Sequence, residues 1–183
     1  QFFDWADMVV AGIPLGYTFG RLGNFINGEL FGRVTTVSWG MVFPHAQKFP
    51  SSQEWVREIA GKVGMDTENL PRYVNLPRHP SQLYEAFLEG AVLFIVLWLL
   101  KGKPWEEKSE SGKKPFWPHG SMTALAMILY GFFRFLVEFV REPDAHLGTV
   151  FLGMTMGQVL SAALAGMGIL LWAIRRKKAV GSS

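Results

Sequence analysis

The sequence predicts an all-α, polytopic membrane protein with four transmembrane helices and a small extramembrane head. Three observations indicate this fold class. Hydrophobic residues make up 49% of the 183-residue chain, four long apolar stretches recur along it, and a polar segment rich in Pro and Gly separates the first stretch from the rest. The charged fraction of 18% is too high for a chain that lies wholly in lipid, so we expect soluble segments between the helices.

The first apolar stretch lies within residues 1–29 and runs from Trp5 to Phe25. It carries Gly12, Gly16 and Gly20 at four-residue intervals. Small residues at this spacing let helices approach closely in lipid. We therefore expect one transmembrane helix that is packed inside a bundle.

Residues 30–79 are too hydrophilic to cross a membrane, and we expect them to form an extracytoplasmic head. Within this segment, Ser51–Val63 has the pattern of a short amphipathic helix. Ser51 or Ser52 is the expected N-cap, because a serine side chain can accept a hydrogen bond from the first turn of a helix.

Residues 80–183 contain the other three predicted transmembrane helices, which are Leu83–Leu100, Ser121–Arg141 and Met154–Ile174. Each is about as long as a helix must be to cross a hydrocarbon core of roughly 30 Å.

The basic residues predict the orientation of these helices. Five lysines lie in the loop 101–120, and the tail Arg175–Lys178 follows the last helix. Because loops rich in Lys and Arg stay on the cytoplasmic side, both segments are expected to be cytoplasmic, with the head and the turn 142–153 outside. This topology explains the net charge of +3 without a nucleic-acid partner.

An arginine stands near the middle of the helix predicted over Ser121–Arg141. Arg134 is about 5 Å from the centre of that span at a rise of 1.5 Å per residue. A charge at that depth costs from about 3 to more than 10 kcal/mol unless it is paired or binds a substrate. Since Tyr130, Arg134, Glu138 and Arg141 follow helical spacing, the sequence predicts a buried polar seam on one helix face.

The end of the first helix carries the densest motif, GRLGNFINGELFGR over residues 20–33. Arg21 and Asn24 share a helical face, and Asn27 and Glu29 follow where the helix ends. A guanidinium offers a planar fork of donors that suits a phosphate. We expect a functional role for Arg21, which lies inside the helix, and an arginine snorkelling to the surface at Arg33.

A second motif, RHPSQLYE over residues 78–85, opens the next helix. Gln82, Glu85 and Glu89 share a stripe of that helix. Two roles are open for these side chains. They could pair with buried arginines, which would remove an unpaired-charge penalty of several kcal/mol, or they could take part in catalysis directly.

Together, Arg21, Arg134 and Arg141 and the nearby carboxylates could form one intramembrane site for a phospholipid or another anionic amphiphile. The residues alone leave an enzyme, a lipid flippase and a lipid-regulated scaffold open. The absence of cysteine excludes a disulfide, a thiolate metal site and a cysteine nucleophile. No metal-ligand cluster and no nucleotide-binding loop stands out in the sequence, so we expect no metal and no cofactor.

These motifs resemble those of the bacterial prolipoprotein diacylglyceryl transferases. The resemblance rests on residues 20–32, on residues 79–85 and on the spacing from Tyr130 to Asp144, and it covers nearly the whole chain. It corresponds to roughly the C-terminal two-thirds of a family member, without the first membrane spans. A start at Gln1 rather than Met fits this expectation of an excerpt from a longer protein.

The resemblance implies transfer of the diacylglyceryl group from phosphatidylglycerol to the lipobox cysteine of a prolipoprotein signal peptide. A thioether forms and glycerol phosphate leaves, in the bacterial inner membrane. The departing phosphate requires preorganised cations, and the attacking group must be a thiolate because a free thiol is mostly protonated at neutral pH.

The resemblance also implies roles for individual residues. Those expected to be catalytic are Arg21, Arg134 and Tyr130. Those expected to bind phosphatidylglycerol are Arg21, Asn24, Asn27, Glu29, Gly32, Arg134, Glu138 and Arg141. Supporting roles are expected for His79, Gln82 and Glu85.

One part of the family pattern is missing. The family's proposed base is a histidine in a His-Gly-Gly stretch, and this sequence has no such stretch. His45, His119 and His146 lie outside the motifs and are expected to be ordinary surface residues, and His79 is not assigned as the base. Two alternatives follow. The chain could need an absent N-terminal part for activity, or it could bind or transport phospholipid without chemistry.

Overall fold

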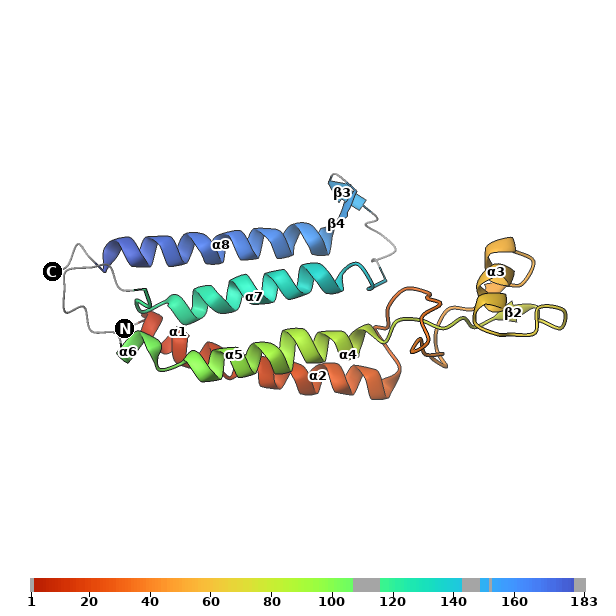
Figure 1. Ribbon diagram of the computed structural model, residues 1–183, viewed down its shortest axis with the longest axis horizontal. Coiled ribbons are helices and arrows are strands. Elements are labelled where there is room, and N and C mark those ends of the chain that lie inside the picture. Colours follow the sequence, from red (N-terminus) through yellow and green to blue (C-terminus); the bar gives the residue numbers. More distant parts are fainter. Residues whose placement is uncertain (1, 107–115, 143–148, 152, 180–183) are drawn as a thin grey trace.

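A computed structural model describes residues 2–106, 116–142, 149–151 and 153–179. The chain is mostly helical, and its long helices lie side by side while one segment projects beyond their ends (Figure 1). We call this end of the bundle the head end. We call the opposite end the basic end, because α8 closes there with Arg175–Lys178.

Two stretches of the described chain are long and apolar enough to cross a membrane, namely Ser81–Trp105 and Met156–Lys178. Helix α7 (Ser121–Val137) is apolar but shorter. A mostly helical protein with two candidate membrane spans is thus confirmed, and the full number of four spans stays a prediction.

The first apolar stretch forms two helices, α1 (Phe2–Val10) and α2 (Ile13–Asn27), so the prediction of one continuous helix was wrong. Pro14 stands in the first turn of α2. Because proline has no N–H and its ring clashes with the preceding turn, it kinks or breaks a helix that would otherwise run through this position. The break falls at Ala11 and Gly12.

The second long stretch begins as α4 (Ser81–Glu85), continues as the π-helix η1 (Ala86–Val92) and ends as α5 (Leu93–Leu100), followed by the short helix α6 (Lys103–Glu106). A π-helical turn is rare and often lies at a functional site. It also shifts the helical phase after Glu85, which simple helical spacing does not anticipate.

Helices α2 and η1 approach closely at a glycine that the sequence did not single out. A Cβ on Gly90 would collide with Thr18 of α2. A Cβ on Gly16 or Gly20 would meet no described atom within 4 Å. Gly16 and Gly20 therefore do not make the predicted close contact with another helix of the described chain.

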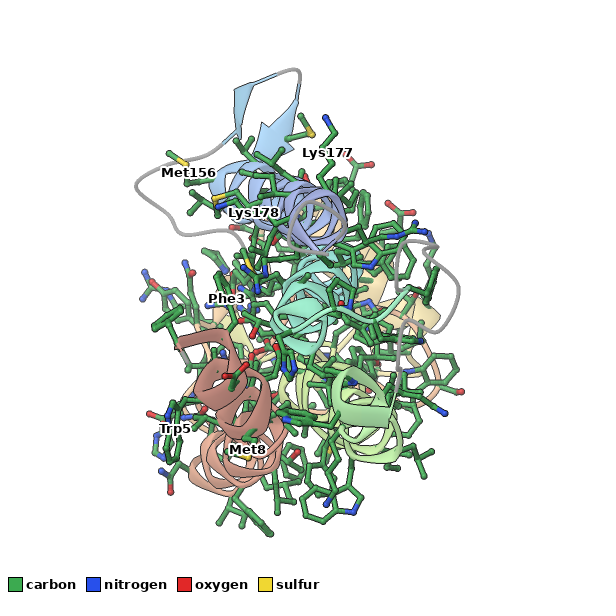
Figure 2. All side chains as sticks on the ribbon, turned by 90° about the vertical axis from the view of Figure 1, so that its left-hand side faces the viewer. Phe3, Trp5, Met8, Met156, Lys177 and Lys178 are labelled. Carbon is green, nitrogen blue, oxygen red and sulfur yellow. The ribbon has the colours of Figure 1, made fainter. Side chains whose placement is uncertain are left out.

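Helix α7 packs on α8 (Met156–Lys178) along most of its length. The two backbones approach closely at Gly131 and Gly168. A Cβ on Gly131 would lie 2.6 Å from Ser161 O, and a Cβ on Gly168 would lie 2.8 Å from Ala124 O. Seen from the basic end, α8 lies on the opposite side of α7 from α1 (Figure 2). Small residues at such a contact are typical of helix pairs in membranes.

The projecting segment has its own small core. Strands β1 (Phe49–Pro50) and β2 (Tyr73–Val74) pair antiparallel beside α3 (Glu54–Lys62). The buried side chains here are Val56, Ala60, Val74 and Leu76. A second short pair, β3 (Thr149–Phe151) and β4 (Met154–Thr155), precedes α8. The all-α prediction thus missed two short strand pairs. These strands are only two or three residues long, which is too short for an alternating hydrophobic pattern to show in the sequence.

The amphipathic helix predicted over Ser51–Val63 is present as α3, but its predicted cap was wrong. Gln53 occupies the N-cap position and makes no side-chain capping bond. Ser51 instead extends the β1–β2 pairing, since its N–H donates to Arg72 O at 3.0 Å.

Asp7 joins α1 to the start of α7, and sequence reasoning missed this contact. Its side chain is fully buried. Its carboxylate accepts hydrogen bonds from the N–H of Gly120 at 2.6 Å and from the N–H and hydroxyl of Thr123 at 2.8 and 2.7 Å. A carboxylate at this place satisfies free N–H groups and suits the positive end of the helix dipole.

We expect Asp7→Ala to lower the free energy of unfolding by about 2–4 kcal/mol, because buried donors at the start of α7 would lose their acceptor. Asp7→Asn keeps one carbonyl oxygen and should cost less. Thermal unfolding in detergent measures both, and equal melting temperatures for Asp7→Ala and the unmodified chain would contradict the role of Asp7.

Candidate functional site

Glu85 lies at the centre of a buried cluster formed by α2, α4 and α7. Its side chain is 0% exposed, and its Oε2 lies 2.7 Å from Arg21 Nε and 3.4 Å from an Nη of Arg134. The arginine side chains are only 17% and 15% exposed. One carboxylate thus joins two guanidinium groups from distant parts of the sequence, which offsets much of the cost of burying them.

Two further carboxylates complete the cluster around Arg134. Glu138 Oε2 lies 3.1 Å from one Nη of Arg134, and Glu89 Oε1 lies 3.8 Å from the other. Glu138 also accepts a hydrogen bond at 3.1 Å from the hydroxyl of Thr155, just before α8. Arg134 and Glu138 of the predicted polar seam therefore lie together, and their partners come from α4, η1 and the residue just before α8.

Tyr17 of α2 is part of the same cluster, although no sequence pattern singled it out. Its hydroxyl donates to Glu89 Oε2 at 2.6 Å and approaches Glu85 Oε2 at 3.3 Å. The guanidinium of Arg21 lies 4.8 Å from the centre of its ring. The ring also meets Tyr130 edge to face at 6.0 Å. Tyr17 thus contacts both an acidic and a basic member of the cluster.

We expect Tyr17→Phe to lower the free energy of unfolding by about 1–2 kcal/mol, because Glu89 would lose a hydrogen bond while the ring under Arg21 remains. Tyr17→Leu removes both contacts and should cost more. Thermal unfolding of the two variants separates the hydroxyl from the ring, and identical losses would contradict a role for the hydroxyl.

A pocket of about 420 Å³ lies between α7 and α8 beside this cluster. Its polar lining consists of Tyr130, Arg134, Glu138, Arg141, Glu142 and Ser161. Its apolar lining comes from Met156, Gly157, Leu160 and Leu164. A pocket with arginines and carboxylates among its polar residues, and aliphatic side chains from α8, suits an amphiphile with a polar headgroup.

Arg141 reaches this pocket in a way that the sequence did not predict. Helix α7 ends at Val137 with Glu138 as its C-cap, so the helix predicted as far as Arg141 was too long. The following residues turn toward the signature motif, where Arg141 forms a backbone bridge with Gly32. Backbone pairing, and not the helical stripe, therefore positions Arg141.

Gly32 lies where three segments cross at the head end. Its N–H donates to His79 O at 2.8 Å, and the next N–H, of Arg33, donates to Val140 O at 2.9 Å. A Cβ on Gly32 would collide with Val140 O and with His79. Only glycine fits this crossing without displacing the backbone, so Gly32 has a packing role here. The predicted contact of Gly32 with phosphatidylglycerol stays a prediction.

Arg78 closes the same crossing from the side of the projecting segment. It is fully buried, and one Nη lies 2.5 Å from Glu142 Oε2. Its guanidinium also lies 4.9 Å from the ring of Phe31 and 5.5 Å from the ring of Phe49. The ion pair fixes the residue that follows Arg141, so Arg78 supports the pocket from outside it.

The amide and acidic residues of the signature motif gather at the end of α2. Gly28, with a φ of +67°, ends the helix in the left-handed conformation that glycine favours. Beside it, Asn24 and Asn27 donate to Glu29 Oε1 at 2.9 and 3.4 Å. Gln82 then ties this turn to α4 by donating to Glu29 O at 2.6 Å.

The side chains of the described histidines make no hydrogen bond or ion pair with the arginines or carboxylates of this cluster. His79 Nδ1 is 3.3 Å from the hydroxyl of Tyr84, which accepts a hydrogen bond from the indole of Trp39. Burial lowers the pKa of His79, which favours its neutral form. His45 is exposed and His119 lies 3.0 Å from Asp4 at the basic end. His146 lies outside the described residues.

The fold and this cluster define a class: a helical membrane protein with a buried arginine–carboxylate site open to a partly apolar pocket. The chain belongs to the prolipoprotein diacylglyceryl transferase family, whose model matches residues 1–174.

Three relatives illustrate this membership, and each is called phosphatidylglycerol–prolipoprotein diacylglyceryl transferase. The Treponema pallidum protein is 48% identical over 151 residues, which are 81% of this chain and 42% of the relative. The Xanthomonas campestris (strain B100) protein is 46% identical over 184 residues, covering 98% and 55%. The Chlorobaculum tepidum protein is 47% identical over 178 residues, covering 96% and 48%. The chain thus spans about half the length of the curated relatives that it matches.

Proposed function

We propose that this chain forms the phosphate-binding half of an enzyme that transfers a diacylglyceryl group from phosphatidylglycerol to the lipobox cysteine of a prolipoprotein. The observation that carries the proposal is the meeting of Arg21 and Arg134 on Glu85 next to a pocket with an aliphatic side. The names of the relatives support the same substrates.

In the proposed reaction, the cysteine thiolate attacks the glycerol carbon that carries the phosphate ester. The carbon–sulfur bond forms as the carbon–oxygen bond breaks, and glycerol phosphate leaves with the electron pair. Arg21 and Arg134 stabilise the charge that develops on that phosphate, because fixed donors in a water-poor site act most strongly where charge develops. Tyr130 orients the headgroup.

The remaining site residues are proposed to bind or support the lipid. Arg141 and Glu138 line the same pocket as Arg134. Asn24, Asn27 and Glu29 form the polar turn at the end of α2, where they would meet the glycerol headgroup. His79, Gln82 and Gly32 hold the segments around that turn together.

We further propose a bacterial inner-membrane topology in which the projecting segment is the extracytoplasmic head. Residues 1–29 and three helices within 80–183 would cross the membrane, with 101–120 and the end of α8 in the cytoplasm. The basic end of α8 and the apolar stretches support this orientation. Accessibility of single cysteines, placed at Glu58 and Lys177, to a membrane-impermeant thiol reagent tests it.

Mass spectrometry of an acceptor peptide tests the reaction. The chain would be reconstituted in phosphatidylglycerol membranes, alone and as a chimera preceded by the N-terminal half of the Xanthomonas campestris relative, with a lipobox peptide. A gain of one diacylglyceryl unit with the chimera is the expected result. A gain with the chain alone would place all catalytic groups within it. Bound lipid without any gain in either protein would favour a lipid-binding protein and overturn the proposal.

A further inference from the structure

A second pocket, of about 510 Å³, lies at the basic end of the bundle, away from the arginine cluster. Its lining consists of Met8, Ala11, Trp98, Lys101 and Trp105. These residues come from α1, the break that follows it, the end of α5, the turn after it and α6. The volume is within the range of pockets that bind small organic molecules.

The lining combines one cation with apolar and aromatic side chains. The Lys101 ammonium lies 3.1 Å from the centre of the Trp98 ring, which is a cation–π contact. Among the side chains that the structure describes, no carboxylate forms an ion pair with Lys101. Lys101 thus brings a positive charge to the lining of the pocket.

The position of the pocket suits the headgroup level of a membrane. Trp98 and Trp105 are half exposed, at 49% and 44%, and tryptophan is enriched at the boundary between water and lipid. Toward the middle of the bundle from Trp98, α5 presents the exposed apolar side chain of Ile95. An acyl chain could follow this apolar surface while its headgroup stays at Lys101.

We propose that this pocket binds a phospholipid with an anionic headgroup, in the leaflet at the basic end and separately from the proposed active site. Lys101 binds the phosphate, Trp98 and Trp105 flank the glycerol region, and Met8 and Ala11 contact the first methylene groups. Basic pockets between helices on that side of a membrane bind anionic headgroups by the same chemistry. The bound lipid fills the space between α1 and α5, and so stabilises the half of the bundle that Asp7 joins to α7.

Photocrosslinking tests the site directly. Phosphatidylglycerol and phosphatidylcholine, each with a diazirine near the start of one acyl chain, would be added in turn to membranes containing the chain. Labelled residues would be mapped by mass spectrometry of its peptides. We expect the peptides that hold Met8 and Trp98 to be labelled about fivefold more by the anionic lipid, as one lysine near the membrane surface provides.

Two lysine variants separate the pocket from general attraction to the basic end. Lys101→Ala should reduce labelling by phosphatidylglycerol to the level of phosphatidylcholine. Lys177→Ala should leave it unchanged, because Lys177 lies on α8, on the other side of the bundle from Met8 (Figure 2). Equal labelling by the two lipids, or an equal effect of the two variants, would overturn the proposal.

The occupant is tested in the longer protein as well. The same labelling in the chimera supports a lipid site. Loss of the label there would overturn the proposal by showing that a polypeptide covers the pocket. None of these readouts requires diacylglyceryl transfer, so failure of the proposed reaction would leave this test intact.

Discussion

Replacing Arg134 with alanine should lower kcat for diacylglyceryl transfer by about 10²–10³-fold, which corresponds to about 3–4 kcal/mol of lost transition-state stabilisation. Arg134 is 15% exposed and lies between three carboxylates and the pocket, so a phosphate in the pocket would meet its free donors. The measurement is single-turnover transfer to a lipobox peptide in the chimera.

Arg134→Lys is the sharper variant. Lysine keeps the charge but loses the planar fork, which pairs with a carboxylate or a phosphate through two parallel hydrogen bonds from separate nitrogens. We expect a loss of activity close to that of alanine, with melting temperature better preserved. Near-normal transfer by either folded variant would remove Arg134 from its proposed role.

Glu85→Ala should cause the largest loss of stability in the chain, about 3–5 kcal/mol, together with a loss of transfer. The carboxylate is 0% exposed and lies within 3.4 Å of both arginines. Without it, Arg21 loses this carboxylate partner while Arg134 keeps Glu138. The effect on stability should therefore arise mainly at Arg21.

Two comparisons make the Glu85 prediction specific. Glu58→Ala removes an exposed carboxylate that pairs with Lys62 on α3, and it should change the free energy of unfolding by less than about 1 kcal/mol. The double variant Glu85→Ala with Arg21→Ala should recover part of the lost stability, because it no longer leaves a buried charge without its partner. A loss in the double variant equal to or greater than the sum of the two single losses would contradict the pairing.

Much of this architecture was predictable because its signals are local. Charges inside apolar stretches are costly, so Arg21, Arg134, Glu85 and Glu138 stand out in one sequence, and the structure brings all four together. The amphipathic pattern of α3 was equally readable, since its apolar positions recur with helical spacing.

Features that depend on contacts between distant segments were not predictable. Nothing local distinguishes Tyr17 from an aromatic residue facing lipid, and its role follows only from Glu89 opposite it. Asp7 likewise has meaning only beside the start of α7. The early end of that helix depends on backbone pairing of Arg141 with Gly32, which periodicity does not report.

The backbone pairing at the head end has a consequence for the length of the projecting segment. The projecting segment leaves the bundle after Arg33 and returns at His79, and these two residues are hydrogen-bonded to each other, with His79 N–H 3.0 Å from Arg33 O. Its two connections therefore lie side by side, like the ends of an insertion. A change in the number of residues between Arg33 and His79 therefore need not alter the register of the helices beneath them.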